Sequence, residues 1–465
     1  MGGIQSATTP YMVATDQPHE DDESPIYRNF HCYTENGGEL ISHFRSQPES
    51  KTVIDILAGS AVMFADKDCM GERIKNPDGS CGPYKYFSYA EVYKRALAFG
   101  RALLDLGLNR GDRVGLYSSN SMWWQLTAFG AYSVGLIIVP VYDSLGPTAA
   151  EYIITHSKIR VVVSSEFKFK NAVDLLPKCD TIEHLIIMGE IPSDYQNVPN
   201  VTVHTCQDLL ESGLKSTTKN EFAGPDDIGV IMYTSGSTGK PKGCMLTQAN
   251  IVAGSVGLGN VNMSASPSDT FLSFLPLAHI YAMSVELMMY AHGARVGFAR
   301  GQVKYLLDDI QAMQPTIIIV VPRVVNKIVE GMKEKLSKQN KYIQKLVNYV
   351  INDKAEKVKH NIPHSLFLDA ILFKDFRAAL GGRIRLIVSG GAPIMPEIFS
   401  FLCSTVTPNI IQGYGLSEVS AGLAVQEVPV MDPMTVGPVS IACECKLRRV
   451  KDTDYDPNSP PESGK

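Results

Sequence analysis

The sequence predicts an α/β protein built on largely parallel sheets. Apolar runs of strand length alternate with longer stretches whose apolar residues recur at helical spacing. This alternation occurs twice, once on each side of a polar segment at 215–227 that contains Gly224-Pro225. Strands separated by helices form βαβ units, and such units give parallel sheets. No segment recurs with a fixed period of about 20–50 residues, so the pattern is not that of a repeat protein.

The part of the chain before this polar segment begins with a polar arm at 1–50 that contains scattered aromatic residues. Ser88-Tyr89-Ala90-Glu91 is a capping box, which predicts that a helix begins there and continues to 108. The apolar runs that follow predict buried strands at 113–117, 136–139, 159–164 and 184–188.

The part of the chain after the polar segment predicts a second set of strands, at 228–233, 270–275, 295–298, 316–321 and 384–388. A helix is predicted at 302–313, and a long polar stretch from 323 to 359 also has the helical pattern. Residues 442–450 resemble a strand. Residues 452–465 are rich in Pro, Ser and Asp, and we expect them to be disordered.

The composition excludes several classes of protein. The 465 residues include 43 Lys and Arg against 48 Asp and Glu, a net charge of −5, so we expect no nucleic-acid partner. No run approaches the roughly 18 apolar residues that cross a bilayer. Residues 1–23 lack the apolar core of a signal peptide and the arginines of a mitochondrial presequence. The nine cysteines are scattered, and the close pair Cys443 and Cys445 lacks a zinc-type spacer, which predicts reduced thiols in a cytoplasmic protein.

Two features of the sequence bear on peripheral membrane contact. Gly2 is followed by Ser6 in the N-myristoylation pattern, although an unstructured polar start has the same appearance, and a single acyl chain anchors weakly. The stretch 323–359 contains ten Lys and Arg against four Asp and Glu. It is either a solvated helix face with ion pairs, or a surface for anionic lipid or a phosphorylated substrate.

The most informative stretch is 233–243, YTSGSTGKPKG, which follows an apolar strand. Its glycines allow a tight turn with N–H groups facing an anion, its hydroxyls donate to phosphate oxygens, and its lysines add positive charge. It is not a Walker A motif, because only two residues separate Gly236 from Gly239 and Pro241 follows the lysine. We therefore expect a loop that clamps a polyphosphate, made of Thr234, Ser235, Gly236, Ser237, Thr238, Gly239 and Lys240.

This loop closely resembles the phosphate loop of the adenylate-forming enzymes, which include acyl-CoA synthetases, luciferases and the adenylation domains of peptide synthetases. Further segments match the family in its order, at 274–279, 321–323, 389–393 and 412–418. The resemblance covers residues 88–447 and is greatest to the long-chain-fatty-acid–CoA ligases, on the runs 275–279 and 380–386. It implies the N-terminal domain of such an enzyme, with two αβαβα-type subdomains and the start of a β-barrel-like one.

The resemblance also implies roles for particular residues. The adenine ring would lie against a loop of small residues: Gly390, Gly391, Ala392 and Pro393. A second nucleotide motif would bind AMP through Gln412, Gly413, Tyr414, Gly415 and Ser417. Within it, Tyr414 would stack on adenine, Ser417 would touch the α-phosphate and Glu418 would hold Mg²⁺. The acyl pocket would include His279, with Ala282 and Met283 where some members have a Trp gate, although a lone histidine is as often a core residue.

The implied activity is that of a long-chain fatty acid–CoA ligase. The fatty acid carboxylate attacks the α-phosphate of ATP, giving acyl-AMP and pyrophosphate, and the thiol of coenzyme A then forms the thioester. Thr234, Lys240 and Glu418 would be the catalytic residues, with ATP, Mg²⁺ and coenzyme A as cofactors. Two alternatives remain open. One is another adenylating enzyme of the medium-chain, bubblegum or acyl-AMP ligase type, and the other is a non-catalytic nucleotide- or lipid-binding protein on the same scaffold.

The implied domain organisation is an arm at 1–50, a first subdomain at 51–220, a second at 221–425 with both nucleotide motifs, and the start of a β-rich third at 426–465. In the family, a further lysine in a C-terminal domain and an aspartate that binds the ribose belong to later motifs, and neither is found in this sequence. We therefore expect the C-terminal domain to be absent and this chain alone to have little or no complete ligase activity.

Overall fold

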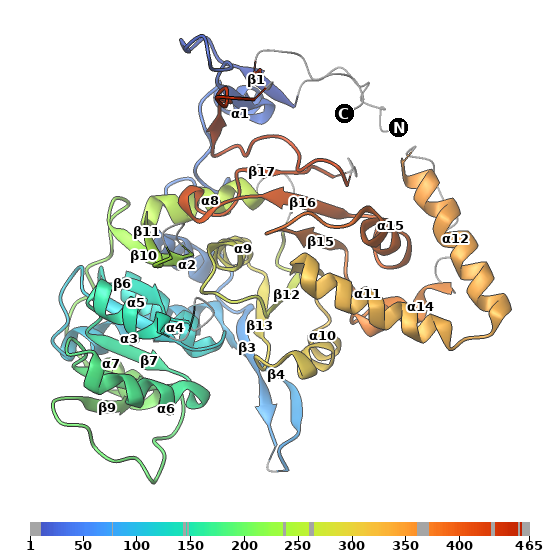
Figure 1. Cartoon of the computed structure of the whole chain (residues 1–465). Coiled ribbons are helices and arrows are strands. Elements are labelled where there is room, and N and C mark those ends of the chain that lie inside the picture. Colours follow the sequence, from blue (N-terminus) through green and yellow to red (C-terminus); the bar gives the residue numbers. More distant parts are fainter. Residues whose placement is uncertain are drawn as a thin grey trace.

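The structure, a computed structural model, describes residues 11–76, 78–142, 146, 148–235, 239–259, 265–359, 372–428, 433–453 and 456–457. Two large sheets and one small sheet make up its strands, with helices between and around the large sheets (Figure 1). The predicted α/β class with largely parallel sheets is confirmed. Gly2 and three residues of the predicted phosphate loop, Gly236, Ser237 and Thr238, lie outside the described residues.

The first large sheet has seven strands in the order β11-β10-β6-β5-β7-β8-β9. All neighbours are parallel except β11, which pairs antiparallel with β10 at the edge. The predicted strands of this sheet lie within two residues of the observed ones. The strands are β5 (Arg113–Tyr117), β6 (Ile137–Pro140), β7 (Val161–Ser164), β8 (His184–Ile187), β9 (Thr202–Thr205), β10 (Ile228–Thr234) and β11 (Lys242–Thr247). The helices are α3 (Tyr89–Asp105), α4 (Met122–Tyr132), α5 (Ala149–Ser157), α6 (Glu166–Leu175), η2 (Leu176–Lys178) and α7 (Cys206–Lys215).

The second large sheet has eight strands in the order β17-β16-β15-β14-β12-β13-β3-β4. Its six inner strands are parallel, and β17 and β4 close the two edges antiparallel. The strands are β3 (Asp68–Lys75), β4 (Cys81–Ser88), β12 (Thr270–Ser273), β13 (Arg295–Phe298), β14 (Ile317–Val320), β15 (Leu386–Ser389), β16 (Ile410–Tyr414) and β17 (Ala424–Val425). The helices are α8 (Gln248–Gly259), α9 (Ile280–Ala291), η3 (Val303–Tyr305), α10 (Leu306–Met313), α11 (Pro322–Ser337), α12 (Lys341–Lys359), α14 (Lys374–Ala379), α15 (Pro396–Thr405) and η4 (Ser417–Val419).

The small sheet joins the two ends of the described chain, at the top of Figure 1. β1 (Met12–Ala14), β2 (Tyr27–Asn29) and β18 (Glu444–Cys445) pair antiparallel, and α1 (Phe30–Asn36) follows β2. Ion pairs strengthen the junction: Arg28 Nη2 lies 2.9 Å from Glu444 Oε2. The strand predicted at 442–450 is therefore only two residues long. The segment predicted to begin a third subdomain pairs with the predicted N-terminal arm.

The predicted division at residues 220 and 221 does not follow the sheets. β10 and β11 come after it in the chain but belong to the first sheet, where β10 pairs with β6. β3 and β4 come long before it but belong to the second sheet, where β3 pairs with β13. Sheet membership depends on hydrogen bonds between distant segments, so the local pattern of apolar residues carries no signal for it.

The helix predicted to begin at Ser88 does so, but its cap is one-sided. Ser88 Oγ accepts a hydrogen bond from the Glu91 backbone N–H at 3.3 Å, while the Glu91 carboxylate binds Arg95 one turn later at 2.8 Å. A reciprocal capping box occurs instead on α2 (Val53–Met63), between Thr52 and Asp55. Arg95, at position i+4, competes for the Glu91 carboxylate and donates both hydrogen bonds to it.

The main core lies between the two large sheets. α4 and α8 pack on the first sheet, α9 packs on the second, and α2 contacts all three of these helices. Every residue of α9 except Tyr281 is buried, as expected for a helix surrounded by protein on all sides. No helix in the described part of the chain combines the length and the apolar run that crossing a bilayer requires.

One acidic side chain, Glu286 of α9, is 1% exposed within this core. Its Oε2 accepts hydrogen bonds from Gln125 Nε2 at 2.7 Å and from the Tyr290 hydroxyl at 3.4 Å. Among the described residues its Oε1 has no hydrogen-bond partner. Burial raises the pKa of this carboxyl to about 7, because an ionised carboxylate loses its hydration there.

Replacing Glu286 by glutamine is expected to stabilise the fold increasingly as pH rises. The pKa is about 7 in the folded protein and 4.5 ordinarily, so the folded protein keeps a proton in this range that the unfolded chain releases. The stability from this proton is present below the lower value and is lost as pH rises through the higher one. The neutral amide avoids that loss, so its advantage should grow by about 2–3 kcal/mol between about pH 5 and about pH 8.

Urea titrations of both proteins at the two pH values check this expectation. The exposed Glu190, replaced by glutamine, is the matched control and should show no such growth. An advantage of glutamine that is equal at both pH values would contradict the expectation.

Candidate active site

The phosphate-loop strand β10 lies beside β6 in the first sheet, so both strands present their carboxyl ends at the same edge. Thr234 ends β10 and is half-buried, and Tyr142 follows β6. The Tyr142 hydroxyl donates a hydrogen bond to the carbonyl of Tyr233, directly before Thr234. On its other side, the Tyr233 hydroxyl lies 2.6 Å from His156 Nδ1 on α5. The base of the phosphate loop is thus held by side chains from two neighbouring elements.

The second sheet presents the other predicted motifs at one edge. β12, β14, β15 and β16 are parallel neighbours, and the segments that contain His279, Gly390 and Tyr414 leave their carboxyl ends. The chain leaves β12 toward β13 and leaves β14 toward β15, in opposite directions. The carboxyl edge at such a switch point is where ligands bind in open α/β sheets.

Two contacts join the edges of the two sheets. Asn120, which follows β5 in the first sheet, donates from Nδ2 to the Leu275 carbonyl at 2.7 Å and accepts at Oδ1 from the Leu277 N–H at 2.9 Å. The rings of Tyr142 and His279 meet edge to face with centroids 5.6 Å apart. The predicted acyl-pocket histidine therefore lies next to the residue that holds the phosphate loop.

His279 precedes the first turn of α9, and its side chain makes no cap hydrogen bond there. Neighbouring protein atoms partly remove it from water, which lowers the pKa of its imidazole below the ordinary value. At neutral pH the ring is therefore uncharged. An uncharged imidazole at the mouth of this edge suits an apolar substrate better than a cation does.

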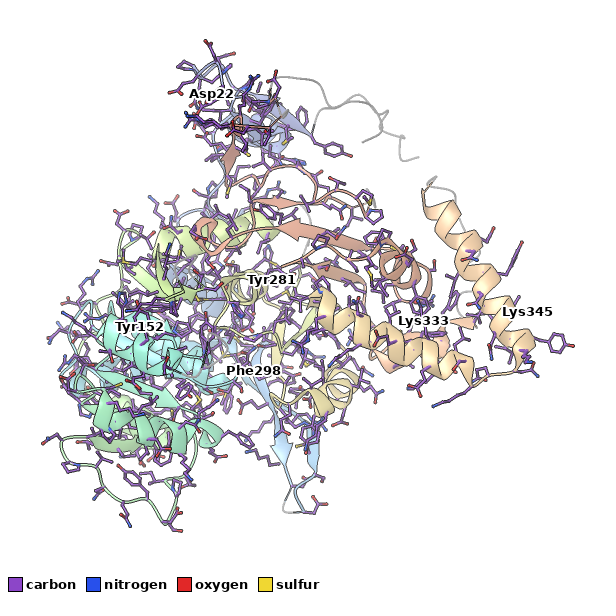
Figure 2. All side chains as sticks on the ribbon, viewed as in Figure 1. Asp22, Tyr152, Tyr281, Phe298, Lys333 and Lys345 are labelled. Atoms are coloured by element: carbon purple, nitrogen blue, oxygen red, sulfur yellow. The ribbon has the colours of Figure 1, made fainter. Side chains whose placement is uncertain are left out.

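The predicted adenine loop begins directly after β15. Gly390 is buried, whereas Gly391, Ala392 and Pro393 are exposed. A Cβ at position 390 would lie 3.2 Å from the ring of Tyr281, whose hydroxyl donates to the Val388 carbonyl at 3.1 Å. Figure 2 places Tyr281 in the middle of the molecule. The missing side chain of Gly390 therefore lets α9 pack against the loop.

Both polar atoms of the Gln412 side-chain amide form hydrogen bonds within the protein. Its Oε1 accepts from the Ile394 N–H at 3.1 Å, and its Nε2 donates to the Pro433 carbonyl at 3.0 Å. It is 4% exposed. Gln412 thus ties the adenine loop to β16 and to the segment that follows Pro433, so a direct contact of its side chain with AMP is not what this geometry favours.

The second nucleotide motif continues beyond β16 into an open turn. Tyr414 is 49% exposed, Glu418 is exposed, Gly413 and Ser417 are half-buried, and Ser417 and Glu418 form the turn η4. Burial raises the pKa of the Cys244 thiol on β11, and the negative charge of Glu418 raises it further. Because Cys244 pairs with Met232 of β10, Glu418 lies beside the hairpin that carries the phosphate loop.

Two glycines allow close backbone contacts within this turn and between the turn and α8. A Cβ at Gly415 would lie 1.4 Å from the carbonyl oxygen of Ala421, and a Cβ at Gly254 of α8 would lie 1.9 Å from that of Ser420. The backbone therefore folds tightly on itself and α8 approaches it closely. Gly415, predicted to contact AMP, is required first for the shape of the turn that presents Tyr414 and Glu418.

The residues present at the two edges fit a magnesium–polyphosphate group. Thr234 and Ser235 offer hydroxyl groups, Lys240 offers an exposed cation, and Gly239 has a φ of +86°, which glycine adopts without strain. Glu418 is exposed, and no hydrogen bond or ion pair joins it to another described residue. Magnesium is commonly held by one or two carboxylates together with phosphate oxygens.

The acyl-pocket residues after His279 lie deeper than the edge. Ala282 and Met283 are 2% and 4% exposed. Met283 lines a narrow cavity between α2, α4, α8 and α9. The other residues that line it are Val53, Gln125, Phe129, Tyr132, Ile251, Leu287 and Tyr290.

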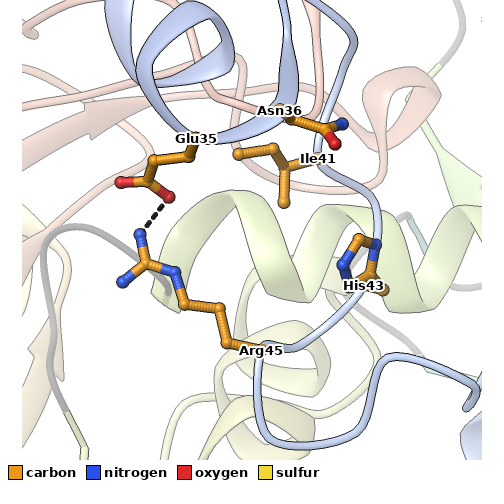
Figure 3. Close-up of a pocket in the computed structure, with 5 residues that line it drawn as sticks. All are labelled: Glu35, Asn36, Ile41, His43 and Arg45. Carbon is orange, nitrogen blue, oxygen red and sulfur yellow. Dashed lines mark hydrogen bonds and ion pairs between the residues drawn. The ribbon is translucent and has the colours of Figure 1, made fainter.

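A more open pocket lies on the N-terminal arm, away from these residues (Figure 3). Glu35, Asn36, Ile41, His43 and Arg45 line it. Glu35 forms an ion pair with Arg45, and a hydrogen bond joins it to His31 Nδ1 at 3.1 Å. The opposite charges of this pocket are paired with each other, so it offers no net charge to a ligand.

Sequence patterns did not indicate three of the positioning residues: Asn120, Tyr142 and Tyr281. Each acts through contacts with a distant segment, which a local pattern does not reveal. The sequence could have indicated Asn120 and Tyr142, because both follow predicted strands at the edge of the sheet where ligands bind.

The family described as "AMP-binding enzyme" matches residues 60–464 of this chain. The chain is 30% identical to the peroxisomal long chain acyl-CoA synthetase 7 of Arabidopsis thaliana over 97% of its own length and 64% of that protein. It is 34% identical to long chain acyl-CoA synthetase 1 of the same plant, over 93% and 66%. The chain therefore spans just under two thirds of the length of these curated relatives.

Solved structures have a similar fold. A long-chain-fatty-acid-CoA ligase from Archaeoglobus fulgidus aligns with a TM-score of 0.64 at 19% identity, over 86% of this chain and 72% of that one. An anthranilate CoA ligase in complex with anthranoyl-AMP aligns with a TM-score of 0.64 at 20% identity, over 85% and 66%. At such identities the likeness concerns the fold.

Proposed function

Because the chain belongs to the family of AMP-binding enzymes, we propose that it carries the nucleotide and acyl sites of an enzyme that activates a long-chain fatty acid with ATP and forms the thioester with coenzyme A. The observation that carries this proposal is the contact between the edges of the two sheets. There, Tyr142 binds the base of the phosphate loop and faces His279 of the predicted acyl pocket. An acyl carboxylate beside His279 would thus lie near the phosphates of a nucleotide on the loop.

The proposed chemistry needs positioning and charge neutralisation but no protein nucleophile. The carboxylate oxygen attacks the α-phosphorus of ATP, pyrophosphate leaves, and the thiol sulfur of coenzyme A later displaces AMP. Thr234 and Ser235 would donate hydrogen bonds to phosphate oxygens, Lys240 would offset their charge, and Glu418 would hold Mg²⁺. Bound Mg²⁺ supplies neutralisation of the charge that develops on the phosphates. Tyr414 would cover the adenine ring, near the loop that begins at Gly390.

ATP–pyrophosphate exchange with a series of fatty acids tests the proposal. We expect exchange that requires Mg²⁺ and rises with acyl length, since each buried methylene contributes about 0.8 kcal/mol. Exchange with short aromatic acids alone would assign the chain to another adenylating enzyme. Binding of ATP without exchange for any acid would favour a non-catalytic nucleotide-binding protein.

Replacing Tyr142 by phenylalanine is expected to lower exchange about tenfold while leaving the thermal midpoint nearly unchanged. The variant loses only the hydroxyl that donates to the Tyr233 carbonyl, and a neutral hydrogen bond contributes about 1 kcal/mol. Because the phosphate loop becomes less well positioned, KM for ATP should rise. Tyr195→Phe, a change of the same chemistry elsewhere in the first-sheet region, is the control. Equal kinetics for the two variants would contradict a positioning role.

We also propose that the protein works in the cytoplasm and contacts membranes peripherally, since long-chain fatty acids partition into bilayers. The support lies in the lysines of α11 and α12, several of which are exposed. Figure 2 labels two of them, Lys333 and Lys345.

A further inference from the structure

α11 and α12 are consecutive helices that extend from the second sheet, at the right of Figure 1, and diverge from the connection between them. α12 is attached to the rest of the protein through α15. In this contact the Ile351 carbonyl accepts a hydrogen bond from Ser404 Oγ at 3.3 Å. Val347 is 2% exposed and packs with Leu336 of α11 and with Phe373. One face of α12 is therefore occupied by protein.

The outward face of α12 carries large apolar side chains. Tyr342 is 83% exposed, Leu346 49% and Tyr349 70%. Their spacing of four and three residues puts them on one stripe along the helix. Ile343, 44% exposed, lies between this stripe and the packed face. Asp353 continues the stripe one turn further and marks its polar end.

The neighbouring helix shows that this exposure is particular to α12. No apolar side chain of α11 is exposed: Val324 and Ile328 are half-buried, and the buried ones are Val325, Val329, Met332 and Leu336. The amphipathic pattern of α11 is thus explained by packing within the chain. In α12, Val347 is buried, whereas no described part of the protein covers the stripe of Tyr342, Leu346 and Tyr349.

Exposed lysines border the stripe. Lys341 and Lys345 lie along one side of it, and neither forms an ion pair with a described residue. The nearest lysine of the connection, Lys338, is bound instead by Glu334 at 2.8 Å. Tyrosines with an apolar ring and a polar tip, next to lysines with long apolar stems, are the side chains typical of the boundary between lipid headgroups and acyl chains.

We propose that α12 lies in the surface of an anionic lipid bilayer, with Tyr342, Leu346 and Tyr349 inserted at the headgroup boundary and Lys341 and Lys345 paired with lipid phosphates. Charge complementarity selects this occupant over a second copy of the chain. In an antiparallel symmetric contact through the same face, the lysine rows of the two copies would lie side by side, and like charges repel. The proposal extends the membrane part of the proposed function, and it concerns binding alone.

Co-sedimentation with vesicles of phosphatidylcholine and phosphatidylserine tests the proposal, with pure phosphatidylcholine vesicles for comparison. The triple variant Tyr342→Ser, Leu346→Ser, Tyr349→Ser should bind the anionic vesicles at least tenfold more weakly. Lys341→Gln and Lys345→Gln should each weaken binding about fivefold, and added salt should reduce the difference. Phe167→Ser is the matched control, since Phe167 is 78% exposed on α6 in the first-sheet region, and it should leave binding unchanged.

A fluorescent reporter gives a second readout that does not depend on how much protein is soluble. The chain has two tryptophans, Trp123 and Trp124, both on α4. In Tyr349→Trp the added emission should shift to shorter wavelength with anionic vesicles and stay unchanged with the neutral ones. Equal vesicle binding by the triple variant, or no shift for Tyr349→Trp, would overturn the proposal. A self-association that the triple variant abolishes, without vesicle binding, would assign the stripe to a second copy.

Pyrophosphate exchange measured without vesicles separates this inference from the proposed activity. The α12 variants should exchange at the rate of the unchanged protein, because α12 carries none of the residues assigned to the site. Loss of exchange with intact vesicle binding would then refute the activity alone.

Discussion

Replacing Glu418 by alanine is expected to lower ATP–pyrophosphate exchange about a hundredfold or more, while the protein remains folded. Glu418 is exposed, bonds to no other described residue, and lies beside the hairpin of the phosphate loop. Without its carboxylate, Mg²⁺ would lose its protein ligand, and the charge on the phosphates would be less well neutralised. Exchange measured over a range of Mg²⁺ concentrations should show a much higher requirement for the ion.

Two further variants make this expectation specific. Glu418→Asp keeps the charge and should restore part of the activity at high Mg²⁺. Glu397→Gln removes an exposed carboxylate from α15, in the same half of the protein, and should leave both the rate and the Mg²⁺ requirement unchanged. A Glu418→Ala protein with a normal Mg²⁺ requirement would exclude Glu418 as the ligand.

Replacing Gly415 by alanine is expected to destabilise the protein by about 3 kcal/mol and to weaken nucleotide binding strongly. The new Cβ would lie 1.4 Å from the carbonyl oxygen of Ala421, which is backbone and has no other rotamer to adopt. The turn must open, and with it Tyr414 and Glu418 move. Guanidinium unfolding gives the change in stability, and titration with ATP and Mg²⁺ gives the change in binding.

Gly331 provides the matched control for this substitution. It lies in α11 with nothing within 4 Å of an added Cβ, so Gly331→Ala should stabilise the protein by about 0.5–1 kcal/mol through better helix propensity. If both alanines had the same effect, the steric explanation for Gly415 would be wrong. If Gly415→Ala were destabilised but bound nucleotide normally, the turn would not present the site.

Two residues with predicted AMP contacts also have contacts within the protein. Gln412 and Gly415 both belong to the motif that resembles a nucleotide-binding segment, and the prediction gave both a contact with AMP. In the structure, the side-chain amide of Gln412 forms hydrogen bonds with the backbone of Ile394 and Pro433. The absence of a side chain at Gly415 leaves space for the carbonyl oxygen of Ala421. Both residues therefore shape the loop, and the AMP contacts predicted for them stay predictions. The side chains of Tyr414 and Glu418 are exposed.

The sequence by itself determined the class of fold, most of the strands and the candidate loops. The strand predicted at 113–117 is observed as Arg113–Tyr117, and that at 295–298 as Arg295–Phe298, because an uninterrupted apolar run bounded by polar residues is a local signal. The phosphate-loop chemistry was also local, since glycines, hydroxyls and lysines lie within a few residues. Only Gly236, Ser237 and Thr238 of that loop lie outside the described residues.

Only the tertiary structure decided which strands share a sheet and how the motifs meet. β10 joins the first sheet and β3 the second, against their order in the chain. Three positioning residues were recognised only from their hydrogen bonds to partners roughly a hundred residues or more away along the chain: Asn120, Tyr142 and Tyr281. Hydrogen bonds and packing between distant segments depend on the shape of the whole chain, so the spacing of residues along it contains no record of them. The same reason applies to α12: its pattern predicted a helix, and only its packing on α15 showed which face was left uncovered.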